Sequence, residues 1–265
     1  MQRILLTIVA AGLTAAIVDQ VMARRGWLPP RFIDQPWRRW LGSAILAFLF
    51  WLGMFGSFAI TDPPELPDQL SIPSLFQMHA LLLLVLAIWW MLGFAQLPGP
   101  KAGFARQFGL SEPKLIFEIA LGGLGACVAW LVAIAAMAVA VGILTATGMD
   151  QVVPTGPPKV VLLLAAMPWL ARLALAISAG VFEEMFFRGF LQPRVGIGLS
   201  TALFVLAHAS YGQPMMLVGV TVLSLIFALF VRYRQSIWAA AAAHAGFDAI
   251  QLLIILPLAT KLSGA

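Results

Sequence analysis

Residues 119–145 read IALGGLGACVAWLVAIAAMAVAVGILT, a stretch without a charged side chain. Roughly 20 apolar residues are enough for a helix to cross the hydrocarbon core of a bilayer. The whole chain has a similar character, because 62% of its 265 residues are hydrophobic and only 10% are charged. A soluble domain has about 25% charged residues, and one water-soluble core cannot bury so much apolar surface. We therefore predict an all-α membrane protein without a separate soluble domain.

Seven further apolar runs lie on either side of this stretch and are long enough to approach or span a bilayer. They are 4–22, 40–60, 77–97, 160–187, 196–210, 214–231 and 236–257. Helices are the only sensible assignment, because an isolated strand in lipid leaves its backbone groups unpaired. The pattern predicts a polytopic bundle of about eight transmembrane helices, with about four in 1–150 and about four in 151–265.

Two of these runs depart from a simple spanning helix. The run 160–187 contains Pro168 and Arg172, which suggests a helix buried within the bundle or a long tilted helix with a break. The first run could be mistaken for a signal peptide. Arg24 and Arg25 follow it, however, and it lacks a convincing cleavage site, so we expect a retained helix.

Basic residues are concentrated in alternate connections between the apolar runs. The first, third, fifth and seventh connections together hold twelve Lys and Arg residues, whereas the termini and the other connections hold only Arg3, Lys159 and Lys261. The positive-inside rule therefore places the first, third, fifth and seventh loops in the cytoplasm and both termini outside. The net charge of +5 is explained by topology and anionic lipid rather than by nucleic acid. The twelve residues in these four loops are Arg24, Arg25, Arg31, Arg38, Arg39, Lys101, Arg106, Lys114, Arg188, Arg194, Arg232 and Arg234.

Ten ionisable side chains lie inside the apolar runs, where each costs at least about 2.5–3.5 kcal/mol at the membrane centre. Six of them fall between residues 183 and 248, and all three histidines of the chain are included. We expect a functional site there, because intramembrane ionisable residues are functional by default. The ten are Asp19, His79, Glu118, Arg172, Glu183, Glu184, Arg188, His208, His244 and Asp248.

Glu183, Glu184 and Arg188 form the first group of these residues. Glu184 and Arg188 are four positions apart, so they share a helix face, and an ion pair would let both stay charged in a low dielectric. Glu183 is turned about 100° away and is left among apolar groups, an environment that suits a general base. The structural alternative is a helix end whose charges reach the cytoplasmic interface, which explains Glu183 poorly.

His208 and the pair of His244 and Asp248 form the other two groups. A lone histidine in a bundle is more often a hydrogen-bonded packing residue than a catalyst. His244 and Asp248 are four positions apart, so the carboxylate can orient the imidazole, or both can face one substrate group. The preceding alanines, 239–243, allow close approach of neighbouring helices.

Together the three groups suit the activation of water, with a carboxylate as base, imidazoles that hold the water, and donors for a developing oxyanion. The same atoms would also suit zinc, as one Glu and two His with an open fourth position. The His-Glu-x-x-His signature of zinc proteases is absent from the sequence. We therefore favour no cofactor, and zinc is the alternative.

These residues resemble the motifs of the CPBP membrane proteases, also called the Abi or CAAX prenyl protease 2-like family. The family pattern is Glu-Glu-x-x-x-Arg, then Phe-x-x-x-His, then His-x-x-x-Asn or a related residue, on three helices of an eight-helix bundle. The resemblance covers about residues 160–250, whereas the first 150 match only as generic membrane helices. The matching residues are Glu183-Glu184 with Arg188, Phe204 with His208, and His244 with Asp248, and the continuation Gly189 to Arg194 is also similar to bacterial members.

The resemblance implies an intramembrane endopeptidase whose catalytic core lies in 151–265 and which hydrolyses a peptide bond near the cytoplasmic half of the membrane. By this analogy Glu183 is the general base and His208 helps to activate the water. By the same analogy His244 with Asp248 would form the oxyanion-stabilising side. Glu184 with Arg188 would support the site. Because an ionised Asp donates no hydrogen bond, we expect Asp248 to orient His244.

The implied substrate is a membrane-associated peptide or protein, and the implied location is the inner membrane of a bacterium. Two other classes of protein compete with this reading. A non-catalytic scaffold or bacteriocin self-immunity protein would keep the fold and bind a partner peptide. A proton-coupled transporter would use buried Glu and His as a relay, but such transporters often show repeated halves, and no repeat is evident here.

Overall fold

The computed structural model describes residues 1–59, 71–149, 151, 153, 159–209 and 213–263, and in these residues the regular structure is helical, without strands. The α-helices are α1 Gln2–Arg24, α2 Pro30–Asp34, α3 Pro36–Phe50, α4 Ile72–Gly93, α5 Phe104–Gln107, α6 Leu115–Ala146, α7 Lys159–Ala165, α8 Trp169–Glu184, α9 Gln192–Val195, α10 Ile197–His208, α11 Pro214–Arg234, α12 Trp238–Ile250 and α13 Leu256–Ser263. Three π-helices extend them at Trp51–Phe55, Met185–Leu191 and Gln251–Ile255, and short 3₁₀ turns lie at Gly56–Ala59 and Pro100–Ala102.

Six of the helical segments are long and apolar enough to cross a membrane: Gln2–Arg24, Pro36–Ala59, Ile72–Gly93, Leu115–Ala146, Pro214–Arg234 and Trp238–Lys261. A shorter apolar helix is α10, and α8 continues without interruption into the π-helix Met185–Leu191. Each of the eight apolar runs is therefore mostly helical where it is described. The predicted class, an all-α polytopic membrane protein, is confirmed.

Proline and small polar residues set several helix ends. Pro36 and Pro214 lie in the first turns of α3 and α11, where a missing N–H costs no helical hydrogen bond. Ser71 caps α4, because its hydroxyl accepts a hydrogen bond from the Ser74 N–H at 3.3 Å. Pro168 directly precedes α8 and separates it from α7, so the break expected in the fifth apolar run is present.

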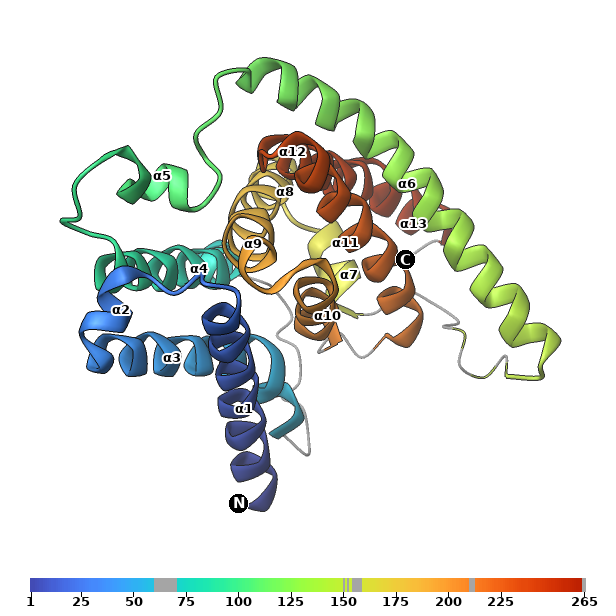
Figure 1. Ribbon diagram of the computed structural model, residues 1–265. Helices are drawn as coiled ribbons and strands as arrows, with labels where there is room; N and C mark the ends of the chain where they lie inside the picture. The colour runs from blue at the N-terminus through green and yellow to red at the C-terminus, as the bar shows by residue number, and fades with distance from the viewer. Residues whose placement is uncertain (60–70, 150, 152, 154–158, 210–212, 264–265) are drawn as a thin grey trace.

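The helices form two groups that meet along α4 and α8 (Figure 1). One group contains α1, α3 and α4, and the other contains α6, α8, α10, α11 and α12. In the second group α12 packs against α6, α8 and α11. Its alanines permit this close packing, because Ala239, Ala240, Ala241 and Ala243 are all buried. Because α8 packs against both α4 and α12, it lies between them.

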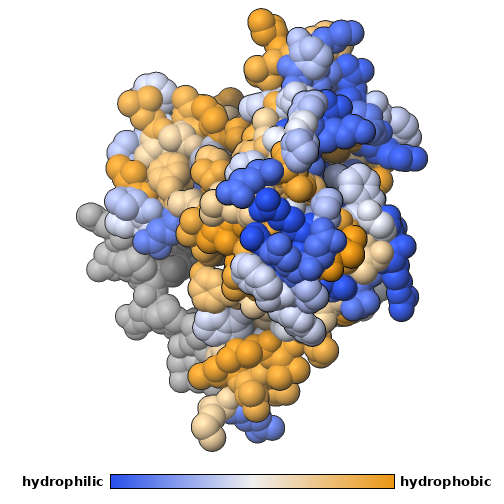
Figure 2. Space-filling view, turned by 60° about the vertical axis from the view of Figure 1, so that its left-hand side comes forward, coloured by the Kyte–Doolittle hydropathy of each residue, from blue (hydrophilic) through white to orange (hydrophobic). Residues whose placement is uncertain are grey.

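Much of the outer surface is apolar, as lipid contact requires. Along α6 large hydrophobic side chains such as Ile116, Leu124 and Leu131 are more than 60% exposed. On the face shown in Figure 2 hydrophobic side chains predominate at the upper left and the bottom of the view, and hydrophilic ones predominate at the centre and right. This separation is the surface pattern of a protein that lies partly in lipid.

Three of the ten intramembrane ionisable residues, Asp19, Glu118 and Arg172, make structural contacts away from the six that lie between 183 and 248. Asp19 on α1 pairs with Arg39 on α3, with Arg39 Nη2 at 2.6 Å from Asp19 Oδ2. Glu118 on α6 accepts hydrogen bonds from the Arg234 guanidinium at the end of α11. Arg172 Nη1 donates to the Leu252 carbonyl at 2.8 Å, inside the π-helix that follows α12. These contacts connect helices within each group.

Candidate active site

The carboxylate of Glu183, near the end of α8, lies between two imidazoles from different helices. Its Oε1 is 3.6 Å from His79 Nε2 on α4, and its Oε2 is 4.0 Å from His208 Nε2 at the end of α10. Glu183 Oε2 is buried and makes no hydrogen bond within the protein. Each oxygen of Glu183 is thus opposed by a different histidine.

The position of one proton on the His79 and His208 rings follows from the contacts of Nδ1, the ring nitrogen that does not face Glu183. His208 Nδ1 lies 2.8 Å from the Phe204 carbonyl oxygen, which only accepts, so Nδ1 carries the proton and donates. The Ser178 hydroxyl donates to the Leu175 carbonyl at 3.0 Å, so its oxygen accepts from His79 Nδ1–H at 2.9 Å. In each ring Nδ1 therefore carries a proton, and the nitrogen that faces Glu183 is Nε2.

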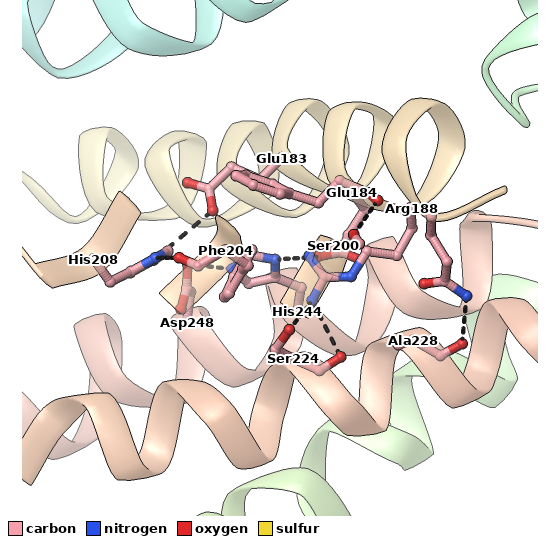
Figure 3. A network of polar contacts seen from close by, with 12 residues as sticks. Glu183, Glu184, Arg188, Ser200, Phe204, His208, Ser224, Ala228, His244 and Asp248 are labelled. Atoms are coloured by element: carbon pink, nitrogen blue, oxygen red, sulfur yellow. Dashed lines mark hydrogen bonds and ion pairs between the residues drawn. The ribbon is translucent and has the colours of Figure 1, made fainter. Parts of the chain in front are cut away.

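Glu184 faces a different set of partners in the interior of the bundle (Figure 3). Its Oε1 is 3.2 Å from Arg188 Nη1 and accepts a hydrogen bond from His244 Nδ1 at 2.9 Å. The side chains of Glu184 and Arg188 are almost completely buried. Arg188 Nη2 also donates to the carbonyl and the hydroxyl of Ser224 on α11, at 3.2 and 3.1 Å. A buried ion pair of this kind persists only with such further hydrogen bonds.

His244 extends from this ion pair toward the more open end of the site. Its ring stacks on Phe227, with the ring centroids 5.0 Å apart, and its Nε2 lies 3.6 Å from Asp248 Oδ2. The Asp248 side chain is 27% exposed, and those of Glu183 and His208 are 19% and 17% exposed. The site therefore opens at Glu183, His208 and Asp248, whereas Glu184 and Arg188 form its closed base.

Phe204, the aromatic residue of the second motif, contacts both parts of the site. Its ring centroid is 4.5 Å from that of His208, and the Arg188 guanidinium carbon lies 4.2 Å above its face. Ser200, one turn earlier on α10, donates to the Phe187 carbonyl at 2.7 Å. A π-helix at this place leaves backbone carbonyls without their usual helical donors, and Ser200 satisfies one of them. These contacts fix α10 against the end of α8.

All six residues named from the sequence lie in this one cluster: Glu183, Glu184, Arg188, His208, His244 and Asp248. The ion pair expected between Glu184 and Arg188 is present, and Glu183 faces another way. His244 is within hydrogen-bonding distance of the Glu184 carboxylate, whereas the Asp248 carboxylate lies farther from its ring.

His79 is the site residue to which sequence reasoning gave no role. The available signal was its presence in an apolar run as one of only three histidines in the chain. No spacing along the sequence links it to Glu183, because 104 positions separate the two residues. Its position in the site follows from the packing of α4 on α8.

A protein site for a metal ion needs several ligand side chains that converge on one point. Among the described residues, no group of three or more His, Cys, Asp or Glu side chains is arranged to hold a metal. The residues as placed do not fit the alternative zinc site of one Glu and two His.

Comparison with known proteins bears on the same segment. A family model described as type II CAAX prenyl endopeptidase Rce1-like matches residues 165–250. No curated protein and no solved structure matches the chain. The matched segment contains the Glu-Glu-x-x-x-Arg, Phe-x-x-x-His and His-x-x-x-Asp motifs and excludes His79. At the level of the family the match supports a CAAX-type intramembrane protease. The resemblance of this chain to the CPBP family of membrane proteases is thereby confirmed over residues 165–250.

Proposed function

We propose that this chain is an intramembrane endopeptidase that hydrolyses a peptide bond of a membrane-associated peptide or protein, with Glu183 as the general base. One observation carries the proposal: Glu183 Oε2 is buried, makes no hydrogen bond within the protein and faces His208 Nε2 at 4.0 Å. That separation is too long for a direct hydrogen bond. It suits a water that donates one proton toward Oε2 and the other toward the lone pair of Nε2.

The chemistry follows from this arrangement. Glu183 takes a proton from the water as the water oxygen bonds to the carbonyl carbon of the peptide, and the carbonyl oxygen becomes an oxyanion. When the carbon–nitrogen bond breaks, the proton passes from Glu183 to the leaving amine. The products are a new carboxylic acid, which releases its proton to water, and a new amine. His208 assists by holding the water in line.

His244 is the proposed donor to the oxyanion. Glu184 holds its Nδ1 as a donor, and Asp248 lies next to Nε2. Two flanking carboxylates favour the doubly protonated ring, which presents Nε2–H. Arg188 compensates the charge of Glu184 and thereby keeps this support in place. An oxyanion donor of this kind, fixed before the reaction, contributes typically about 2.7–4 kcal/mol.

Several wider assignments complete the proposal. The helices of 1–150 form the N-terminal part and those of 151–265 the catalytic core, although α4 brings His79 to the same site. We place the protein in the plasma membrane of a bacterium with both termini outside the cytoplasm, following the charge asymmetry of its loops. The substrate lies in or on the bilayer, and a prenyl group on it is a variable of the test.

The decisive experiment is proteolysis of fluorogenic membrane-peptide libraries by the purified protein in liposomes. Each library is offered with and without a C-terminal prenylcysteine. Wild type is compared with Glu183→Gln and His208→Ala, each with and without a chelator. Cleavage by wild type alone, unaffected by chelation, is the expected result. Cleavage that is lost on chelation and restored by zinc would overturn the metal-independent mechanism. Equal cleavage by Glu183→Gln, or none by folded wild type across the libraries, would overturn the proposal.

A further inference from the structure

His79 stands outside both the predicted motifs and the family match, yet its Nε2 is nearer to Glu183 than that of His208 is, at 3.6 Å against 4.0 Å. It is buried within the bundle, with 6% of its surface exposed. A buried imidazole needs hydrogen-bonding partners. His79 has a hydrogen bond to Ser178 through Nδ1, and its Nε2 faces Glu183 at 3.6 Å; both neighbours belong to α8.

The His79 ring is fixed in orientation by contacts on several sides. Nδ1 donates to Ser178 Oγ at 2.9 Å. The ring stacks on Phe182 with the centroids 6.2 Å apart, and Phe76 contacts it edge-on at 6.4 Å. These contacts leave Nε2 directed at Glu183 Oε1. The direction of Nε2 is thus set before any substrate binds.

The two oxygens of Glu183 consequently have different surroundings. Oε2 is buried without a hydrogen-bond partner, whereas Oε1 lies beside His79. Because an ionised Glu183 only accepts, the contact between Nε2 and Oε1 is attractive when the imidazole carries the proton on Nε2 and donates it toward Oε1. A shared proton at Oε1 would hold the carboxyl plane and leave Oε2 as the oxygen directed toward His208.

We propose that His79 is a positioning residue that holds Oε1 of Glu183, so that Oε2 is presented to the water and to His208. The N-terminal group of helices then supplies one of the two imidazoles that flank the general base. The kinetic part of this inference rests on the proposed peptidase function. A purely structural role is the competing explanation, in which His79 only attaches α4 to α8 through Ser178.

Two substitutions separate these roles, because they copy different halves of the ring. His79→Asn keeps a polar group at the position of Nδ1, within reach of Ser178, but does not extend to Glu183. His79→Gln extends as far as Nε2, and its amide N–H can donate to Glu183 Oε1. His79→Ala removes both contacts. All three are compared with wild type as folded, monodisperse protein in detergent.

We expect His79→Ala and His79→Asn to lower kcat by about tenfold or more with little change in KM, because positioning of the base acts in the transition state. His79→Gln should recover most of the rate. Rates of His79→Asn equal to those of His79→Gln, or a kcat of His79→Ala close to that of wild type, would overturn the proposal.

A second measurement does not depend on catalysis. Dicyclohexylcarbodiimide reacts with carboxyl groups in membranes, and mass spectrometry can report the labelling rate of Glu183 separately from those of Glu184 and Asp248. We expect this rate to change in His79→Ala and His79→Asn and to return toward the wild-type value in His79→Gln. An unchanged rate in all three variants would overturn the positioning role. If wild type cleaves no peptide but the labelling pattern is as expected, the peptidase proposal fails while the contact between His79 and Glu183 stands.

Discussion

The carboxylates of Glu183 and Glu184 face different parts of the site although the residues are neighbours on α8 (Figure 3). Glu183 lies between His79 and His208, at the more open end. Glu184 is completely buried against Arg188 and His244. Two adjacent residues of identical chemistry therefore have separate tasks, and a matched pair of substitutions can distinguish them.

Glu184→Ala should destabilise the protein by about 3–5 kcal/mol, because it leaves the buried Arg188 charge uncompensated. Glu183→Gln should leave the unfolding transition nearly unchanged and lower kcat by at least about 100-fold, since it removes the general base. Thermal unfolding in detergent and peptide cleavage, measured on the same preparations, check both. Equal destabilisation by the two substitutions would contradict the division of roles.

Gly122 and Gly123 on α6 offer a second matched pair. A Cβ at Gly122 would clash with the Ala239 carbonyl oxygen and lie 3.0 Å from the Ala243 nitrogen on α12, whereas a Cβ at Gly123 meets nothing within 4 Å. Gly122→Ala should therefore cost about 1–3 kcal/mol through overpacking against backbone. Gly123→Ala should be neutral or stabilising by up to about 1 kcal/mol, because alanine favours the helix.

Thermal unfolding of the two glycine variants is the direct measurement, and cleavage activity is the second. Because α12 carries His244, displacement of α12 by Gly122→Ala should also lower activity, while Gly123→Ala should not. A stable and fully active Gly122→Ala variant would show that α6 and α12 are not packed as described.

Asp248 permits a test of the oxyanion side of the site. Asp248→Asn should retain most of the activity, because the amide keeps the shape of the carboxyl and an oxygen that can accept from His244. Asp248→Ala leaves His244, the proposed oxyanion donor, without this neighbour, and the loss of activity should stay below the loss of about 100-fold that follows removal of an oxyanion-hole donor itself. Single-turnover rates check the two variants. Retention of full activity by Asp248→Ala would remove Asp248 from the catalytic group.

The orientation in the membrane can be tested with the single native cysteine removed by Cys127→Ser. In that background Lys101→Cys lies in the third loop and Lys261→Cys near the C-terminal end, and both positions are exposed. The positive-inside rule predicts that an impermeant maleimide labels only Lys261→Cys in intact cells. Labelling of Lys101→Cys alone would reverse the predicted topology.

The helices and the Glu184–Arg188 pair could be predicted from the sequence for simple reasons. Apolar runs in lipid have helices as their solution, and Pro168 marks the break before α8. The Glu184–Arg188 pair follows from a spacing of four positions on one helix. Contacts of this kind are local, so they can be predicted before the bundle is known.

Contacts between distant helices could not be predicted in this way. His79 and Glu183 meet because α4 packs on α8 at a particular rotation, which the interlocking of many side chains decides. The π-helix Met185–Leu191 was also unexpected, because its apolar residues have the same composition as an ordinary helix continuing from Glu184. Similarly, the hydrogen bond of His244 to Glu184 depends on how α12 is placed along α8.

The placement of His79 on α4 has a consequence for how the chemistry of this protein can diversify. The segment that matches the family model carries the proposed base and donors, but one neighbour of Glu183, His79, comes from a helix outside that segment. Exchanging the N-terminal helices between two such proteins would therefore exchange a neighbour of the reacting water together with the lipid-facing surface. In a chimera of this kind, turnover rate would therefore respond to a part of the chain that carries no recognisable protease motif.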